Sequence, residues 1–212
     1  MSQFDLRTWT TKRLILSVDV DAQSWSQRFR YALAHGIAAD IDLRSADLRG
    51  ADLHNINLHR ALLPGVSFVD ADLRSANLTL ATLMFADCRG ADFQGADLRE
   101  AYLTGALLLD ARNLPPVPVI PDLDHEILTA LEHGGELDMN AWHTCDTTHC
   151  RAGWAVTLAG KEGKKLEAKY GPATAASLLY AASCPHLPIP NFYVPNEEAL
   201  LDMRARVEAT KN

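Results

Sequence analysis

The feature that most constrains this chain is an uninterrupted repeat with a period of five residues. From Ile41 to Asp110 the sequence divides into 14 consecutive five-residue units. The third residue of each unit is large and apolar, with eleven leucines, two phenylalanines and one cysteine. The first residue is alanine in eleven units and Ile or Val in the others. An α-helix repeats roughly every 3.6 residues and a strand every 2, so neither element collects this pattern on one face.

The pattern fits a square coil in which each five-residue unit forms one side. The third and first residues of every unit then point inward, and stacked coils bury them as ladders. Backbones of successive coils pair at about 4.8 Å, so about three and a half coils make a rod about 17 Å long. Asp, Asn, Ser and Gly at the remaining positions suit tight corners and exposed sites.

The units ADLRG, ADLHN, ANLTL and ADLRE, which begin at residues 46, 51, 76 and 96, resemble the pentapeptide-repeat family. The resemblance covers residues 41–112 and implies a right-handed quadrilateral β-helix. The whole layout also resembles a group of prophage and phage proteins, through WHTCDTTHCRAGWAVTLAG at 142–160 and NFYVPNEEALLDM at 191–203. This second resemblance implies an architecture and an origin but no biochemical activity.

The sequence predicts three further parts around the β-helix. Residues 1–40 form an N-terminal cap, with a strand at RLILSVDV and a helix that begins near Ser24 and stops at Gly36. Residues 113–123 are too rich in proline for a helix or a central strand and form a linker. Residues 124–212 form an α-helical domain, whose predicted helices lie at 124–134, 148–160, 173–183 and 196–209.

Composition narrows the function and the compartment. The net charge of −7 argues against a general nucleic-acid binder, which needs a basic face. The N-terminus has no apolar run with a small-residue cleavage site, and no stretch approaches the roughly 18 apolar residues of a membrane span. Four unevenly placed cysteines are typical of cytosolic thiols rather than of a disulfide framework. The expectation is a cytoplasmic protein that binds neither nucleic acid nor membrane.

The residue types at His143, Cys145, His149 and Cys150 suit zinc. Their spacing does not, because four ligands within eight residues, two of them adjacent, cannot easily surround one ion. The other possibilities are a Cys145–Cys150 disulfide, a Cys150 nucleophile, or a structural helix start capped by Thr147 or Thr148. We favour the structural helix start. Cys88, at a repeat centre, is predicted to fill the core, and His54 and His59 are predicted to be solvated. No catalytic motif is found, so the sequence predicts neither an enzyme nor a cofactor.

Two outward surfaces are candidate binding sites. Residues 20 apart stack, so Asp52, Asp72 and Asp92 should form a ladder of carboxylates that repel one another unless Arg74 or corner amides compensate. In the functional interpretation these carboxylates imitate DNA phosphates. The resemblance to the family implies this role, because its quinolone-resistance members bind gyrase. The favoured interpretation is that aspartate recurs because it caps corners. Arginines at positions 44, 49, 74, 89 and 99 also weaken the negative field.

The second surface is apolar and breaks the rule that outward positions are polar. It comprises Leu62, Pro64, Leu80, Met84, Phe85 and Tyr102. An exposed patch of this kind usually marks a contact, here with the chain's own helical domain, a second copy or a foreign protein. The sequence therefore predicts a non-enzymatic scaffold that binds a protein partner. A second copy of the chain, which would make a homodimer, is one such partner. The alternatives are a DNA mimic acting on a DNA enzyme such as gyrase, and a metal- or thiol-dependent activity near Cys145 and Cys150.

Overall fold

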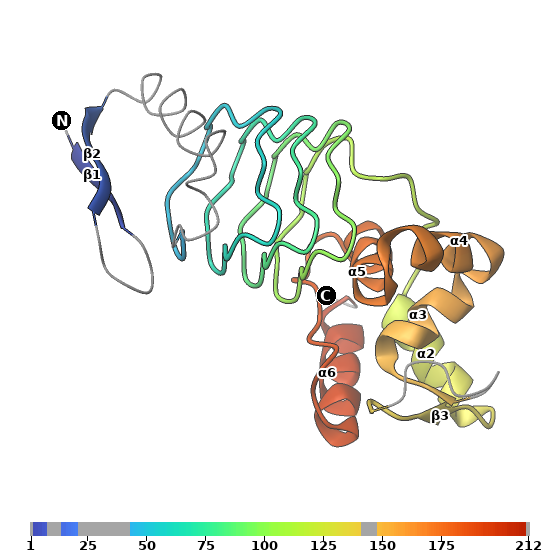
Figure 1. Ribbon diagram of the computed structural model, residues 1–212. Coiled ribbons are helices and arrows are strands. Elements are labelled where there is room, and N and C mark those ends of the chain that lie inside the picture. The colour runs from blue at the N-terminus through green and yellow to red at the C-terminus, as the bar shows by residue number, and fades with distance from the viewer. Residues whose placement is uncertain (1, 8–13, 21–42, 141–147, 211–212) are drawn as a thin grey trace. The chain divides into compact units, whose positions relative to one another are not determined.

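The computed structural model of the 212-residue chain describes residues 2–7, 14–20, 43–140 and 148–210. The chain forms two compact units, Met1–Leu114 and Pro115–Asn212 (Figure 1). The helix predicted between Ser24 and Gly36 lies outside the described residues.

Two antiparallel strands stand at the start of the first unit. They are β1, Ser2–Arg7, and β2, Leu14–Val20, and they pair Phe4 with Val18 and Leu6 with Leu16. The strand predicted at RLILSVDV is β2. Its partner β1 was missed because SQFDLR holds only two apolar residues, too few to establish a period.

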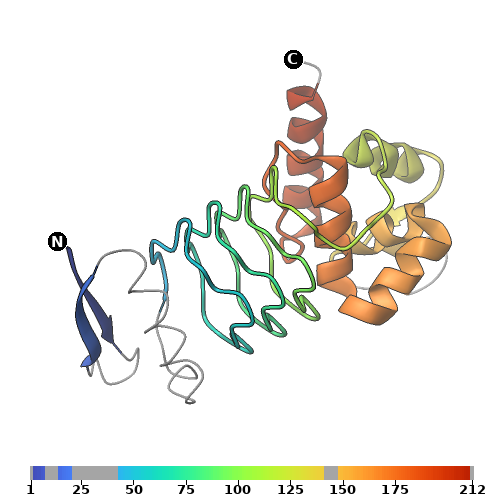
Figure 2. The ribbon, with the colours of Figure 1, turned by 90° about the horizontal axis from the view of Figure 1, so that it is seen from above.

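The repeats form a β-helix, as their period predicts. Parallel bridges join residues 20 positions apart, from Asp47↔Ser67 to Asp92↔Arg112, so four five-residue units make one turn. Backbone hydrogen bonds connect the turns, for example Leu53 N–H to the Asp72 carbonyl at 2.8 Å and Asp72 N–H to the Ala51 carbonyl at 2.9 Å. The stacked turns are visible from two sides in Figures 1 and 2. The total of three and a half coils stays a prediction, because Ile41 and Asp42 lie outside the described residues.

The core of the β-helix is the ladder of third-position side chains. None of the 14 is more than 6% exposed. Full burial of a leucine or phenylalanine contributes about 1.5–3 kcal/mol, so this ladder is the main source of stability in the unit. Cys88 is completely buried within it, and burial raises the pKa of its thiol to about 12, which confirms it as core filler.

The fifth residue of every unit turns the corner in a left-handed conformation. All 14 have a positive φ, between 55° at Ser45 and 73° at Gly105. Gly, Asn and Asp tolerate this conformation best, and most corners use them or serine. Four corners hold residues that disfavour it: Arg60, Leu80, Phe85 and Glu100.

The second unit contains five helices and one short parallel strand pair among its described residues. In chain order these are α2 Leu123–Glu132, β3 Glu136–Leu137, β4 Thr148–His149, α3 Arg151–Leu158, α4 Gly160–Tyr170, α5 Pro172–Ser183 and α6 Asn196–Ala209. Helix α3 packs against α2, α4 and α5, and α6 packs against α2. The four predicted helices are all present.

The sequence prediction missed helix α4. Its sequence GKEGKKLEAKY is dominated by charge, and the apolar signal is weak. Only Gly163, Leu166 and Tyr170 are buried, at the i, i+3, i+7 spacing of a single helical face. Glycines at both ends then separate α4 from its neighbours, with positive φ at Gly160 and Gly171.

Candidate interaction surface

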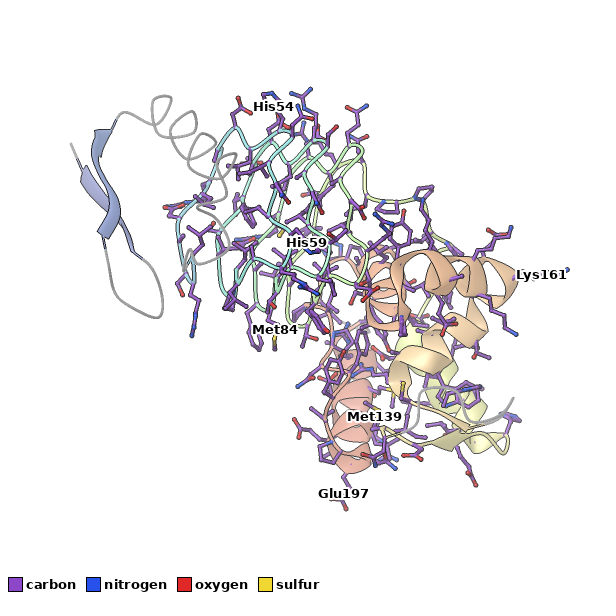
Figure 3. All side chains as sticks on the ribbon, in the orientation of Figure 1. His54, His59, Met84, Met139, Lys161 and Glu197 are labelled. Carbon is purple, nitrogen blue, oxygen red and sulfur yellow. The ribbon has the colours of Figure 1, made fainter. Side chains whose placement is uncertain are left out.

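One side of the β-helix carries no charged residue over three successive turns. It consists of residues 61–65, 81–85 and 101–105, and is called the uncharged face below. Bridges stack Leu62 on Thr82 and Thr82 on Tyr102. Leu62, Phe85 and Tyr102 are 46%, 65% and 42% exposed, and Met84, labelled in Figure 3, is half-buried. The turns thus bring together four of the apolar residues singled out from the sequence.

Leu80 and Phe85 occupy corners at either end of the central unit of this face. Their φ values are 59° and 57°, a region that costs a bulky L-residue about 1–2 kcal/mol. Phe85 is also largely exposed to solvent, so an unfavourable backbone conformation and an unfavourable exposure of an aromatic side chain coincide at this residue. Every corner of the β-helix shares this backbone conformation, so it is the exposed apolar side chains that make the uncharged face the candidate for binding.

The acidic ladder exists, but each of its carboxylates has a partner. Bridges join Asp52 to Asp72 and Asp72 to Asp92. Asp52 Oδ1 lies 2.5 Å from Nδ1 of His54, and Asn113 Nδ2 donates to Asp92 Oδ1 at 2.8 Å. These two side chains are not among the predicted compensating groups, which were Arg74 and corner amides, and the contact with Asp52 also corrects the expectation that His54 is only solvated.

Arg74 is the strongest of these partners. Its Nε and Nη2 donate to the two oxygens of Asp72 at 2.8 and 2.6 Å, and this hydrogen bonding lowers the pKa of the Asp72 carboxyl. The oxygens and ring nitrogens of Asp52, His54 and Asp72 lie within 4.8 Å of one another, a spacing that a metal could use. Because the guanidinium already occupies both oxygens of Asp72, these residues are better described as an ion-pair network than as a metal site.

The same Asp-x-Arg fork recurs on other sides of the β-helix. Nη2 of Arg49, Arg89 and Arg99 lies 2.5–2.6 Å from the aspartate two residues earlier in each case. Such exposed pairs contribute little to stability, about 0–1 kcal/mol each. Each pair also places a guanidinium beside an aspartate, so these sides of the β-helix do not display bare carboxylates.

The cysteine and histidine segment is only partly within the described residues. His143 and Cys145 lie outside them. Cys150 is buried, and its pairing with Cys145 is not tested because Cys145 lies outside the described residues. His149 is also buried, and its ring makes a T-shaped contact with that of Trp154. Burial raises the pKa of the Cys150 thiol, which disfavours the thiolate that a nucleophile requires.

The start of α3 differs from the prediction that Thr147 or Thr148 caps it. The N-cap is Cys150, whose Sγ accepts a hydrogen bond from the Gly153 N–H at 3.4 Å. Thr148 instead belongs to β4, where it pairs with Glu136. The N-cap preference for threonine yields here to the tertiary pairing of β3 with β4.

A buried charge network, which the sequence analysis missed, holds the second unit together. Arg151 is fully buried, and its Nη2 donates to Asp124 Oδ1 at 2.7 Å. Arg206 Nε donates to the other oxygen of Asp124 at 2.8 Å, and the Tyr180 hydroxyl donates to Oδ1 at 2.7 Å. Asp124 thereby joins four helices, α2, α3, α5 and α6.

A sequence signal for this network does exist. Asp124, Ile127, Leu128 and Leu131 share one helical face, so a carboxylate sits in an apolar stripe. Arg206 falls on the face of Ala199 and Met203 in the same way. A charge at a core position implies a buried partner of opposite sign, although the sequence alone does not identify which one.

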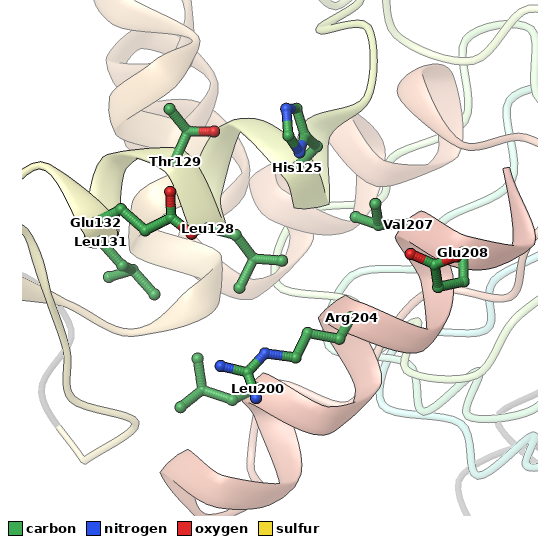
Figure 4. A pocket seen from close by; sticks show the side chains of 9 residues that line it. All are labelled: His125, Leu128, Thr129, Leu131, Glu132, Leu200, Arg204, Val207 and Glu208. Carbon is green, nitrogen blue, oxygen red and sulfur yellow. The ribbon is translucent and has the colours of Figure 1, made fainter. Parts of the chain in front are cut away.

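The described residues of the second unit line two grooves. The first, about 480 Å³, lies between α2 and α6, with Leu128, Leu131 and Leu200 among its apolar residues and Arg204 and Glu208 among its charged ones (Figure 4). The second, about 460 Å³, lies between residues 115–118 and α4. Among the described residues, no helix combines the length and apolar character needed to cross a membrane.

The family model for pentapeptide repeats matches residues 41–79 and 81–112, in eight copies. These residues belong to the pentapeptide-repeat family. The match coincides with the described β-helix, so the resemblance that the repeat units carry is confirmed. No curated protein matches the chain.

Several solved pentapeptide repeat proteins are similar to this domain. One of them is HetL from the cyanobacterium Nostoc sp. strain PCC 7120, a protein involved in heterocyst differentiation regulation. It is 40% identical to this chain, covers 32% of this chain and 34% of its own length, and has a TM-score of 0.22. A second Nostoc pentapeptide repeat protein is 28% identical over 42% of this chain and 80% of its own, with a TM-score of 0.19. The plasmid-mediated fluoroquinolone resistance protein QnrB1 is 20% identical over 35% and 44%, with a TM-score of 0.15. The chain thus spans about a third of the length of HetL.

Proposed function

We propose that this protein is a non-enzymatic, cytoplasmic interaction module of prophage or phage origin, which binds a protein partner through the uncharged face of its pentapeptide-repeat domain. The observation that carries the proposal is the exposure of Leu62, Phe85 and Tyr102 on one side of three successive turns that carry no charge. The other three sides of the β-helix all carry aspartates and arginines. A partner that covers this face removes exposed apolar area from water.

The chemistry of this face favours a protein surface over nucleic acid. A phosphate backbone is held by lysine and arginine, and the uncharged face has neither. Exposed aromatic and methionine side chains instead resemble the centre of a protein–protein interface, where charges are depleted. We therefore expect a partner with a complementary apolar patch and a polar rim.

A DNA mimic acting on a DNA enzyme such as gyrase is the alternative proposal. It rests on the stacked carboxylates of Asp52, Asp72 and Asp92. The guanidinium of Arg74 lies against Asp72 in the middle of this ladder, so the ladder does not carry the unbroken negative charge of a phosphate backbone. Replacing the three aspartates by asparagine abolishes the effect on the enzyme if this alternative holds.

The experiment that separates the proposals is affinity capture from a lysate treated with nuclease. Three baits are compared: the wild-type chain, a Met84→Asp/Phe85→Asp variant, and a Gln94→Asp/His59→Asp variant. The last is the matched control, because Gln94 and His59 lie on other sides of the β-helix. The proposal predicts a nuclease-resistant partner that the first variant loses and the second keeps. Capture that survives Met84→Asp/Phe85→Asp but is lost with the asparagine variant contradicts it and supports the acidic ladder.

A further inference from the structure

Helix α4 is a basic element within an acidic unit. Residues 115–212 contain 13 acidic and 8 basic residues, yet four of the eight are lysines of α4. Lys161, Lys164, Lys165 and Lys169 are all exposed. Two other basic residues, Arg151 and Arg206, are buried in the network around Asp124 and are not displayed to a partner. The positive charge on the surface of this unit is therefore concentrated on α4; Lys161 is labelled in Figure 3.

Two of these lysines line the groove between α4 and the proline-rich segment. The groove is about 460 Å³ and is walled by Pro115, Pro116, Val117 and Pro118 on one side and by Leu166 and Tyr170 on the other. Lys165 and Lys169 stand on the same helical face, one turn apart. Glu162 also lines the groove, so its charged edge carries two ammonium groups and one carboxylate beside the apolar walls.

The lysines keep donors for a ligand. Lys165 Nζ contacts Glu162 Oε1 at 2.6 Å, and Lys169 Nζ lies 4.8 Å from the centre of the Tyr170 ring. An ammonium has three N–H donors, so each of these single contacts leaves the group able to bind a carboxylate. The groove wall itself offers few backbone donors, because three of its four residues from 115 to 118 are prolines. Recognition must then come from side-chain charge and apolar contact rather than from strand pairing.

We infer that this groove binds an acidic peptide segment, with a bulky apolar side chain between the proline wall and Leu166 and with carboxylates on Lys165 and Lys169. Charge complementarity selects an anionic ligand, and the apolar walls select a peptide over inorganic phosphate. A short peptide interacts mainly with the positive charge of α4 close to the groove. A long nucleic acid extends beyond the screening length of about 8 Å and meets the net negative charge of the unit and of the chain.

The test is fluorescence anisotropy of the full chain with a fluorescein-labelled peptide of glutamate and aspartate that carries one central leucine. Lys165→Glu/Lys169→Glu is expected to weaken binding about tenfold, since two favourable contacts become repulsive. The matched control is Lys161→Glu/Lys164→Glu, which changes the charge of the same helix equally without altering a groove residue. Replacing the peptide leucine by serine is expected to weaken binding to the wild type as well.

Three outcomes overturn the inference. The first is no binding by the wild-type chain at low salt. The second is an equal loss with both lysine pairs, which shows attraction to the helix as a whole. The third is equal or tighter binding of a single-stranded oligonucleotide of the same charge, which identifies a nucleic-acid surface. Because the uncharged face is unaltered in these variants, failure here leaves the proposed function of the repeat domain standing.

Discussion

The ring of Phe85 lies against the backbone of Gly105, the corner residue one turn further along the β-helix. A β-carbon placed on Gly105 would stand 2.3 Å from Cδ1 of Phe85, closer than real contacts allow. A side chain at position 105 therefore depends on a movement of the Phe85 ring.

The dependence predicts that Gly105→Ala is unusually destabilising. The substitution meets both a positive φ of 73° and the Phe85 ring, and we expect a loss of about 2–4 kcal/mol in the free energy of unfolding. Gly50→Ala is the matched control, because Gly50 has a similar φ of 62° and nothing within 4 Å of its added carbon. It should lose only about 1 kcal/mol. Urea denaturation measures both, and equal losses would show that the ring does not restrict Gly105.

The corner conformation can be tested without touching the uncharged face. Glu100 is an exposed corner residue with a φ of 56°. Asparagine tolerates this conformation and β-branched residues do not. We expect Glu100→Asn to raise the thermal midpoint and Glu100→Val to lower it, each by the equivalent of about 0.5–1 kcal/mol. A stabilising Glu100→Val would mean that this corner is not left-handed in solution.

The Asp72–Arg74 pair predicts a specific pH dependence. The hydrogen bond from Arg74 lowers the pKa of Asp72 below its ordinary value of 3.8. A carboxyl whose pKa is lower in the folded state stabilises the fold above its ordinary pKa, and this stabilisation is lost as the pH falls through the folded value. Carbon-13 NMR titration should show the Asp72 pKa rising towards 3.8 in Arg74→Gln. An unchanged pKa would mean that the fork does not persist in solution.

The β-helix was predictable because its information is local and repeated. The large apolar residue at the third position of all 14 units, leucine in eleven of them, indicates the same inward direction, so the register follows from the period alone. The pairing of Asp72 with Arg74 was likewise foreseeable, since both lie on one unit. Helix α4 was missed because its buried face comprises only Gly163, Leu166 and Tyr170.

The partners of Asp124 were not predictable in the same way. They lie 27, 56 and 82 residues away, at Arg151, Tyr180 and Arg206. The apolar faces of α2 and α6 mark Asp124 and Arg206 as buried charges, but no periodicity connects positions on separate helices and identifies their partners. Only the packing of α2, α3, α5 and α6 brings them together.

The network around Asp124 predicts a large loss of stability on its removal. Asp124→Asn leaves two buried guanidinium groups without their shared counter-charge, which should cost about 3–5 kcal/mol. Asp202→Asn is the control, because Asp202 also contacts Arg151 but its side chain is 47% exposed, so we expect about 1 kcal/mol or less. Circular dichroism of the helices during urea unfolding measures both. A loss for Asp124→Asn no larger than that for Asp202→Asn would refute the central role of this carboxylate.

The most direct test of the uncharged face as a binding surface is photo-crosslinking from position 85. p-Benzoylphenylalanine in place of Phe85 keeps an aromatic ring at the corner, and the same group in place of the exposed Gln94 reports on another side of the β-helix. The proposal predicts an intermolecular crosslink to a protein from position 85 and none from position 94. Crosslinks from position 94 alone, or from position 85 only to the chain's own helical unit, would contradict it.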